Sequence, residues 1–438
     1  MTPEPESAGP SAAERLLAGP LRRLSTWGPN ADGRVVAVVA IALYLGIIAA
    51  GRLEWHFDLW PYFGVPPGPS LFFDARNLTA AWECQRLGHD PLFDNPCDPW
   101  RRPLMYLRPW LLLGVLGLDQ SHTVALAVVL VTVMFLSFFV LVGRVPLGMG
   151  IVLAVAACSP AVMLAVERAN MDIALFSLLA ASAIMWRAFP GPARIISPLA
   201  VLVAATAKLY PVFALPAFLA AGSRVAARVA LLCIAVFAAY LLFSLRDVRH
   251  VAAIATQGDE FSYGARILIA HLYHQVGADS WPGPAIVKQL IAAIPIALLG
   301  GAIAIRVHRR FDGLRGEESV ASAALLALLL GALIYLGTFA TVNSFDYRLV
   351  FLLLTLPQLL EWVRMPAHPL SVLASGTLAG VLLLLWVGSL SHWLHLWDEL
   401  ASWGVAGLLA AVVAATSPRM TVIRRSLLGR FATAPMER

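Results

Sequence analysis

The acid best placed to do chemistry in this sequence is Asp74. It lies in a polar, Pro-rich and aromatic segment from Leu71 to Pro109, in a chain otherwise built from long apolar runs. A carboxylate beside a bilayer is costly unless it faces water or a substrate, so Asp74 is a candidate functional residue. The simpler alternative is that Asp74 caps a short helix that starts at Ala75, because Asp is a favoured N-cap residue.

Other polar residues in apolar surroundings are further candidates for the same site. The chain has lysine only at Lys208 and Lys288, which makes Lys208, inside an apolar block, conspicuous. The remaining candidates are Glu83, Arg108, Arg168, Asn170, Asp172, Tyr210, His271, His274, Asn343, Asp346, Arg348 and His392.

Several of these candidates also have a purely structural interpretation. Asn170 and Asp172 could cap the helix that follows them. Lys208 could extend its ammonium to an interface, and Arg348 could pair locally with Asp346. His271 and His274 could share a helix face and bind a metal ion, but no third ligand is close to them in the sequence.

The composition places these residues in a membrane protein. Of the 438 residues, 59% are hydrophobic and 13% are charged, and the mean hydropathy is +0.76. A soluble domain carries about 25% charged residues, whereas apolar runs of about 20 residues, long enough to cross a bilayer, recur along this chain. The sequence predicts an all-α polytopic membrane protein. The chain has a net charge of +6. In a membrane protein this excess of basic residues is expected in the cytoplasmic loops, and it does not indicate nucleic-acid binding.

The distribution of arginines predicts the topology. Arginines precede the first apolar run, and this places the N-terminus in the cytoplasm. We expect about 11–12 spans or half-spans, with both termini cytoplasmic. The expected crossings are Val35–Gly51, His122–Val142, Leu147–Val166, Ile173–Trp186, Val225–Leu245, Ala285–Arg306, Val320–Thr341, Arg348–Arg364, Leu370–Leu390 and Trp403–Thr416.

The apolar block Ile195–Ala221 is expected to be a broken hairpin rather than a single crossing. It is interrupted at Lys208-Leu-Tyr210-Pro211 and has arginines near both ends. A hairpin with Lys208 near its apex keeps the basic loop around residues 313–318 in the cytoplasm and Asp259 outside, in accord with the positive-inside rule.

These expectations divide the chain into three parts. Residues 1–33 form a disordered cytoplasmic tail, residues 34–418 a single transmembrane domain, and residues 419–438 a basic cytoplasmic tail. Residues 52–120 form a long extracytoplasmic loop that contains Cys84 and Cys97, and an oxidising exterior would permit a disulfide between them. The alternative is two unpaired thiols. The Asn77-Leu-Thr79 sequon in the same loop is interpreted as a chance match.

In this topology the non-basic polar residues gather at the extracytoplasmic face. A channel or porter is expected to carry its polar groups near the midplane, on broken helices between repeats. The sequence therefore predicts that the chemistry takes place at the outer face.

The order of the motifs resembles that of the GT-C integral-membrane glycosyltransferases, and is most similar to glycosyltransferase family 87. That family includes actinobacterial mannosyltransferases that use polyprenyl-phosphate-mannose. The resemblance covers about residues 35 to 365. After the first span and Asp74, it rests on Gly88-His-Asp90-Pro91-Leu-Phe93, Tyr106-Leu-Arg108-Pro109, Asn170-Met-Asp172, Lys208-Leu-Tyr210-Pro211 and Asn343-Ser-Phe-Asp346-Tyr347.

The resemblance implies an enzyme of the plasma membrane. It would move a sugar such as mannose from a polyprenyl-phosphate carrier to a cell-envelope glycolipid or glycan on the extracytoplasmic face, with inversion. No cofactor is expected, and the sequence has no Gly-rich phosphate loop and no paired-carboxylate metal motif. Asp74 would be the general base. The donor phosphate would bind Lys208, Arg348, Arg108 and Arg168. Further substrate contacts would come from Tyr210, Asn170, Asp172, Asp346 and Tyr347.

Two other classes of protein remain open at this stage. A transporter or flippase of polyprenyl-linked sugars would share the basic groove and the aromatic loop, but it would need no base. A non-catalytic scaffold in envelope assembly would need neither Asp74 nor Lys208.

Overall fold

The computed structural model describes the greater part of the chain, with several gaps. It covers residues 19–54, 56–220, 223–255, 261–265, 267–268, 294, 322–341, 344–365, 368, 370–388 and 391–416. The residues outside the described part are His271, His274, Asn343, Asp259, the loop at 313–318 and, apart from Ile294, the expected crossing Ala285–Arg306; the side chain of His392 is outside it as well.

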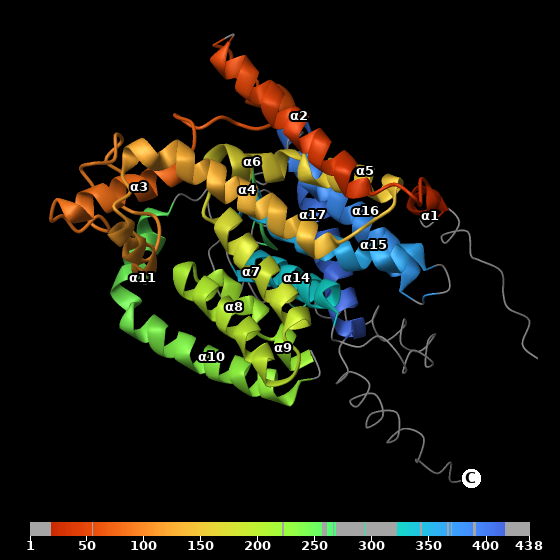
Figure 1. Ribbon diagram of the computed structural model, residues 1–438. Coiled ribbons are helices and arrows are strands. Elements are labelled where there is room, and N and C mark those ends of the chain that lie inside the picture. Colours follow the sequence, from red (N-terminus) through yellow and green to blue (C-terminus); the bar gives the residue numbers. More distant parts are fainter. Residues whose placement is uncertain are drawn as a thin grey trace, which may run out of the picture.

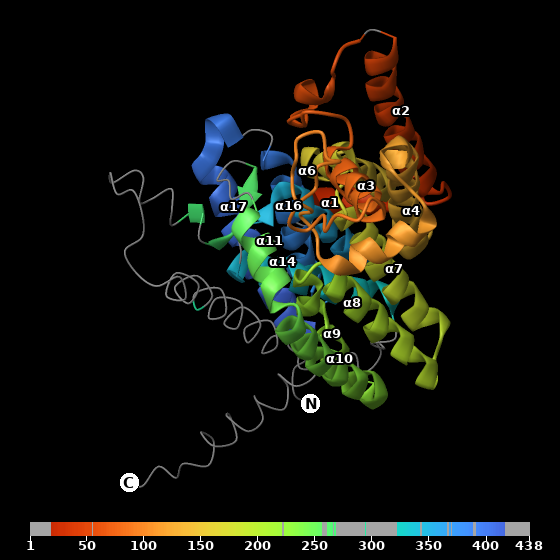
Figure 2. The same cartoon turned by 90° about the vertical axis from the view of Figure 1, so that its left-hand side faces the viewer.

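The described residues are predominantly helical (Figures 1 and 2). The α-helices are α1 (Gly19–Thr26), α2 (Gly33–Leu53), α3 (Phe73–Arg86), α4 (Thr123–Val142), α5 (Leu147–Ala157), α6 (Pro160–Arg168), α7 (Asp172–Ala188), α8 (Ile196–Ala207), α9 (Ala217–Ala220), α10 (Arg224–Phe243), α11 (Leu245–Ile254), α14 (Ala323–Thr341), α15 (Leu356–Arg364), α16 (Ser371–Val387) and α17 (Ser391–Thr416). The 3₁₀ segments are η2 (Trp60–Phe63), η3 (Arg108–Leu116), η4 (Gln120–His122), η5 (Gly191–Ile195), η6 (Tyr210–Ala214) and η7 (Asp346–Thr355). The two-residue strands β1 (Ser262–Tyr263) and β2 (Ser344–Phe345) pair antiparallel, with Ser262 opposite Phe345.

Among the described residues, five helical segments are long and apolar enough to cross a membrane. They are α2, the η4–α4 segment from Gln120 to Val142, α10, α14 and the Trp397–Thr416 part of α17. The pair α5 and α6, bent by 55°, would be a sixth. Helix α14 is the most buried of these segments and lies in the middle of the bundle in both views. These segments agree with the expected class of polytopic helical membrane protein, although the described residues contain five or six candidate spans where 11–12 spans or half-spans were expected for the whole chain.

Two expected crossings are interrupted. Leu147–Val166 is broken between α5 and α6, where Pro160 lacks the N–H that would continue the helix. Arg348–Arg364 is not one α-helix either, because the ten residues of η7 are followed by α15, which has a proline in its first turn.

The expected hairpin in the apolar block around Lys208 is confirmed. The Tyr240 hydroxyl, about 24 Å along α10 from its start, donates to the Thr206 carbonyl near the end of α8, at 3.1 Å. Helix α9 ends at Ala220, four residues before Arg224, the first residue of α10. The chain therefore ascends along α8, turns at Lys208 and returns through η6 and α9.

The N-terminal helices dock through glycines. The Gly33 amide donates to the Val145 carbonyl at 2.7 Å, which joins the start of α2 to the start of α5. A β-carbon on Gly150 would lie 2.0 Å from the Gly33 carbonyl oxygen, and one on Gly33 would lie 2.2 Å from the Pro146 oxygen. Only glycine permits backbones to approach this closely.

We therefore expect Gly150→Ala to destabilise the docking of α2 on α5. The added methyl group would overlap a backbone oxygen, and overpacking of this kind costs about 1–3 kcal/mol. The midpoint of thermal unfolding in detergent should fall. Gly46→Ala is the matched control, because Gly46 lies in α2 with no atom within 4 Å of an added β-carbon. An equal effect of both substitutions would contradict this account of the α2–α5 contact.

Candidate active site at the starts of α3 and α7

Asp74 lies in the first turn of α3 and does not cap it. The helix begins at Phe73, its N-cap is Phe72, and no side chain forms a cap hydrogen bond there. The alternative in which Asp74 caps a helix that starts at Ala75 is therefore wrong. Its carboxylate instead accepts a hydrogen bond of 2.6 Å from the side-chain amide of Asn170.

The turn before α3 is fastened to the end of α6. Phe72 has a φ of 55°, which is a left-handed conformation that bulky residues rarely adopt. Its N–H donates to the Glu167 carbonyl at 3.1 Å, and the buried Glu167 carboxylate accepts from the Gly68 N–H at 2.9 Å. Glu167 thus holds the strained turn from which Asp74 emerges, although the sequence did not single it out as a site residue.

Asn170 connects Asp74 to the start of α7 and to Lys208. It follows Ala169, which ends α6 in a left-handed conformation. The Asn170 side-chain oxygen accepts from the Asp172 N–H at 3.0 Å and from the Lys208 ammonium at 3.1 Å. Asn170 therefore accepts from the N–H of Asp172, the first residue of α7, which is the structural role considered for it above. It also contacts Asp74 and Lys208 and so belongs to the site.

Lys208 lies inside the cluster. It follows α8 in an extended conformation, and its ammonium forms an ion pair with the carboxylate of Asp172, which is fully buried. The Lys208 side chain is 15% exposed, so it does not extend to an interface as the alternative proposed. The ammonium also lies 5.4–5.8 Å from three tyrosine ring centres, those of Tyr106, Tyr210 and Tyr347.

Arg348 approaches the same carboxylate from η7. Its Nε lies 3.7 Å from the second oxygen of Asp172, and a terminal nitrogen donates to the Ser344 hydroxyl at 3.0 Å. Its guanidinium also lies 5.1 Å from the ring centre of Tyr210. Arg348 thus pairs with Asp172 rather than with Asp346.

Two further arginines flank Phe73, next to Asp74. Arg168 forms an ion pair with Glu167 at 3.1 Å, and its guanidinium lies 5.7 Å from the Phe73 ring centre. Arg102 lies 3.5 Å from the same ring centre and donates to the Phe73 carbonyl at 3.1 Å. Arg102 was not among the site residues predicted from the sequence. The one local indication of its position was its four-residue spacing from Asp98, with which it forms an ion pair.

Two of the predicted site residues lie elsewhere. Arg108 is 44% exposed and is held by Asp90 at 2.8 Å and by Asp247 at 2.7 Å, and none of its described contacts reaches the Asp74 cluster. Asp346 is buried and points towards Gly388, the residue that follows α16, because its Oδ2 lies 2.5 Å from the position that a β-carbon on Gly388 would take. Among the described residues, the structure therefore does not bring Arg108 or Asp346 into contact with the Asp74 cluster, where phosphate binding by Arg108 and substrate binding by Asp346 were predicted.

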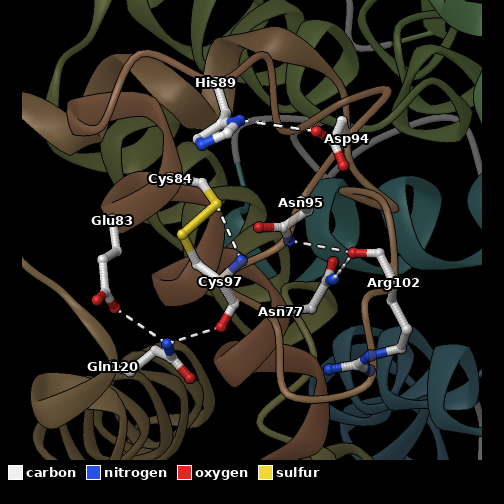
Figure 3. The surroundings of a disulfide bond; sticks show 9 residues. All are labelled: Asn77, Glu83, Cys84, His89, Asp94, Asn95, Cys97, Arg102 and Gln120. Carbon is white, nitrogen blue, oxygen red and sulfur yellow. Dashed lines mark hydrogen bonds and ion pairs between the residues drawn. A yellow bond between two sulfur atoms is a disulfide. The ribbon is translucent and has the colours of Figure 1, made fainter.

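The loop after α3 is fixed by a disulfide and by buried polar groups (Figure 3). Cys84 and Cys97 are joined, with their α-carbons 5.6 Å apart. The Gln120 amide, just before α4, donates to the Glu83 carboxylate and to the Cys97 carbonyl at 3.0 and 2.9 Å. Asn77 of the sequon is 1% exposed, and its amide is within reach of the Asp98 carboxylate at 3.3 Å. Its side chain is therefore part of the loop's interior.

Electrostatics favour proton transfer at Asp74. Burial raises the pKa of Asp74 above its ordinary value, and the Arg168 cation and the Asn170 hydrogen bond offset part of this rise. A carboxylate whose pKa is raised towards the working pH is a better general base than an ordinary one. The cluster thus offers a base, at Asp74, beside cations that can stabilise a developing negative charge.

We expect Lys208→Met to destabilise the protein, because it leaves the buried Asp172 carboxylate without its ammonium. Loss of one partner of a buried ion pair costs about 3–5 kcal/mol. Adding Asp172→Asn removes the unpaired charge, so the double variant should unfold at a higher temperature than Lys208→Met alone. Thermal unfolding in detergent measures both. No recovery in the double variant would show that this pair does not carry the stability assigned to it.

Comparisons with known proteins identified no relative. No protein-family model matches the sequence, and searches of curated proteins and of solved structures found no significant similarity. The resemblance to the GT-C glycosyltransferases therefore rests on the motifs alone. The function is inferred below from these motifs and from the side chains that the fold brings together.

Proposed function

We propose that this chain is a membrane glycosyltransferase of the GT-C type, which transfers a sugar from a polyprenyl-phosphate carrier to an acceptor hydroxyl with inversion. The site faces the extracytoplasmic side of the plasma membrane and both termini are cytoplasmic. A mannosyl donor and a cell-envelope glycolipid or glycan acceptor fit the motif resemblance. The observation that carries the proposal is the Asn170 side chain, which holds a carboxylate and an ammonium on its two ends.

The separation of these two groups suits a displacement at a sugar carbon. The contacts of 2.6 and 3.1 Å meet on one short amide, so the Asp74 oxygen and the Lys208 nitrogen lie within about 8 Å of each other. In inverting glycoside hydrolysis the two catalytic carboxyl groups are about 6.5–9.5 Å apart, which leaves room for the attacking molecule. The value of about 8 Å is an upper limit, and in this proposal the Asp74 carboxylate and the Lys208 ammonium flank the anomeric carbon in a comparable way.

Each group then has a defined task. Asp74 accepts the proton of the acceptor hydroxyl as the oxygen forms its bond to the anomeric carbon. The bond from that carbon to the phosphate oxygen breaks, and the polyprenyl phosphate leaves with the electron pair. Lys208 and Arg348 stabilise the charge that grows on this phosphate. Arg168, whose guanidinium lies 5.7 Å from the Phe73 ring centre, adds a further positive charge near Asp74.

The position of the cluster suits a donor with its tail in lipid. Lys208 lies at the turn of the α8–α9 hairpin, level with the last turns of the candidate span α10. A polyprenyl chain embedded among the spans would therefore present its phosphate near the ends of the helices, where the cations lie. Tyr106, Tyr210 and Tyr347 border the same ammonium and would contact the sugar phosphate.

Replacing Asp74 by Asn should remove the base while keeping its shape. We expect transfer from a polyprenyl-phosphate sugar to fall by about 10²–10⁴-fold, as is typical of general-base loss, with little change in donor affinity. Asp94→Asn is the matched control, since Asp94 is an exposed carboxylate of the same loop, with a side chain that is 75% exposed. Near-normal transfer by folded Asp74→Asn protein would refute the catalytic role and favour a transporter.

The pH dependence of turnover provides a second test. Protonated Asp74 cannot accept a proton, so turnover should fall as the pH drops through its pKa, which lies above the ordinary aspartate value. Arg168→Gln removes the cation that most favours the carboxylate, so the acid limb should move to higher pH. Arg86→Gln, at an exposed arginine elsewhere on α3, is the control. An acid limb that stays in place or moves to lower pH would contradict the assignment of that limb to Asp74.

A further inference from the structure

Segment η3 exposes a run of large aliphatic side chains outside the candidate spans. Leu112, Leu113, Val115 and Leu116 are 71%, 41%, 89% and 63% exposed. Burial of one such side chain is worth about 1.5–3 kcal/mol, so water is an unfavourable environment for the four together. The other face of the segment, formed by Trp110, Leu111 and Gly114, is buried against the protein.

Each end of η3 lies close to the end of a candidate membrane span. The Trp110 indole donates to the Ala207 carbonyl at 3.0 Å, at the end of α8. The neighbouring Thr206 carbonyl accepts from Tyr240, which lies in the last turn of the candidate span α10. At its other end, η3 is followed within a few residues by Gln120, the first residue of the span that contains α4.

We propose that η3 is inserted into the lipid of the bilayer interface as a wedge, with Leu112, Val115 and Leu116 among the hydrocarbon chains. The end of the candidate span α10 is apolar and exposed as well, since Leu242 and Phe243 are 76% and 95% exposed, and the Arg108–Asp247 ion pair joins η3 to the helix that follows α10. The occupant of this surface is therefore the same lipid that surrounds α10.

The short helix α11 supports this placement. It continues directly from α10 after Ser244 and is joined to η3 by the ion pair between Arg108 and Asp247, at 2.7 Å. Figure 1 shows α11 beside the loop region that follows α3. Its sequence combines aliphatic residues with the exposed Arg246 and Arg249, which is the composition of a helix that lies in the headgroup region of a membrane.

Insertion of η3 would also set the depth in the membrane of α3, the helix that carries Asp74. Helix α3 rests on η3, because the Trp82 indole donates to the Trp110 carbonyl at 2.8 Å. A β-carbon on Gly114 would lie 2.9 Å from the Gln85 side chain, so the contact is close. The consequence for Asp74 rests on the proposed function, whereas the insertion itself does not.

The test uses the full chain in nanodiscs, with a single cysteine introduced and labelled with an environment-sensitive fluorophore. Val115→Cys reports on the wedge. Val128→Cys, on the exposed face of α4, is the lipid reference, and Asp94→Cys is the aqueous reference. Unsubstituted protein gives the background from Cys158 and Cys233. Each sample is measured with brominated lipids and, separately, with iodide in solution.

We expect the label at position 115 to lose fluorescence to brominated lipid to the same extent as the label at position 128, and to be insensitive to iodide. Quenching of position 115 by iodide, as at position 94, would place the segment in water and overturn the proposal. Protection from both quenchers would overturn it as well, since it would mean that protein covers the segment. The readout does not involve sugar transfer, so it is independent of whether the proposed enzyme activity is correct.

Discussion

The ion pair between Lys208 and Asp172 is the constraint on which the organisation of the site depends. An ammonium at the end of an apolar helix is costly unless a counter-ion and hydrogen bonds compensate it. Asp172, fully buried at the first position of α7, supplies the charge, and Asn170 supplies a hydrogen bond. The pair therefore ties the turn of the α8–α9 hairpin to the start of α7. Arg348 reaches the same carboxylate, which brings η7 to the same place.

This arrangement explains how a few side chains can prepare a site before substrate binds. Because Asp172 and Asn170 already hold the Lys208 ammonium, the proposed binding of a phosphate would need little reorganisation. The same amide orients the Asp74 carboxylate. A disulfide and the Gln120 contacts hold the loop after α3 to the helix that carries Asp74, so the proposed base and the cations are positioned from opposite sides of Asn170.

Much of this site could be predicted from the sequence, because its members are polar residues at breaks between apolar runs. The Lys208-Leu-Tyr210-Pro211 break and the Asn170-Met-Asp172 helix start were located correctly. The orientation of Asp346 could not be predicted, because in a 3₁₀ segment with three residues per turn Asp346, Tyr347 and Arg348 must point in different directions.

The partners of Arg108 were equally inaccessible to sequence reasoning. One of them, Asp247, is 139 residues away in the chain, and no local spacing indicates such a contact. The path of the loop brings Tyr106 and Arg102 to the site. This path is determined by the buried Asn77 side chain, which forms hydrogen bonds with the backbone of residues 102–105. Tyr106 belongs to a recognised motif, but its contact with Lys208 does not follow from local spacing.

The most direct test of the central claim is to follow the sugar itself. Purified protein is reconstituted in liposomes with a polyprenyl-phosphate donor, radiolabelled in the sugar, and a glycolipid acceptor fraction from a cell envelope. We expect the label to move from the carrier to the acceptor, and the anomeric configuration of the product to be opposite to that of the donor. Label that crosses the bilayer while still attached to its carrier, with no glycosylated product, would contradict it and identify a transporter.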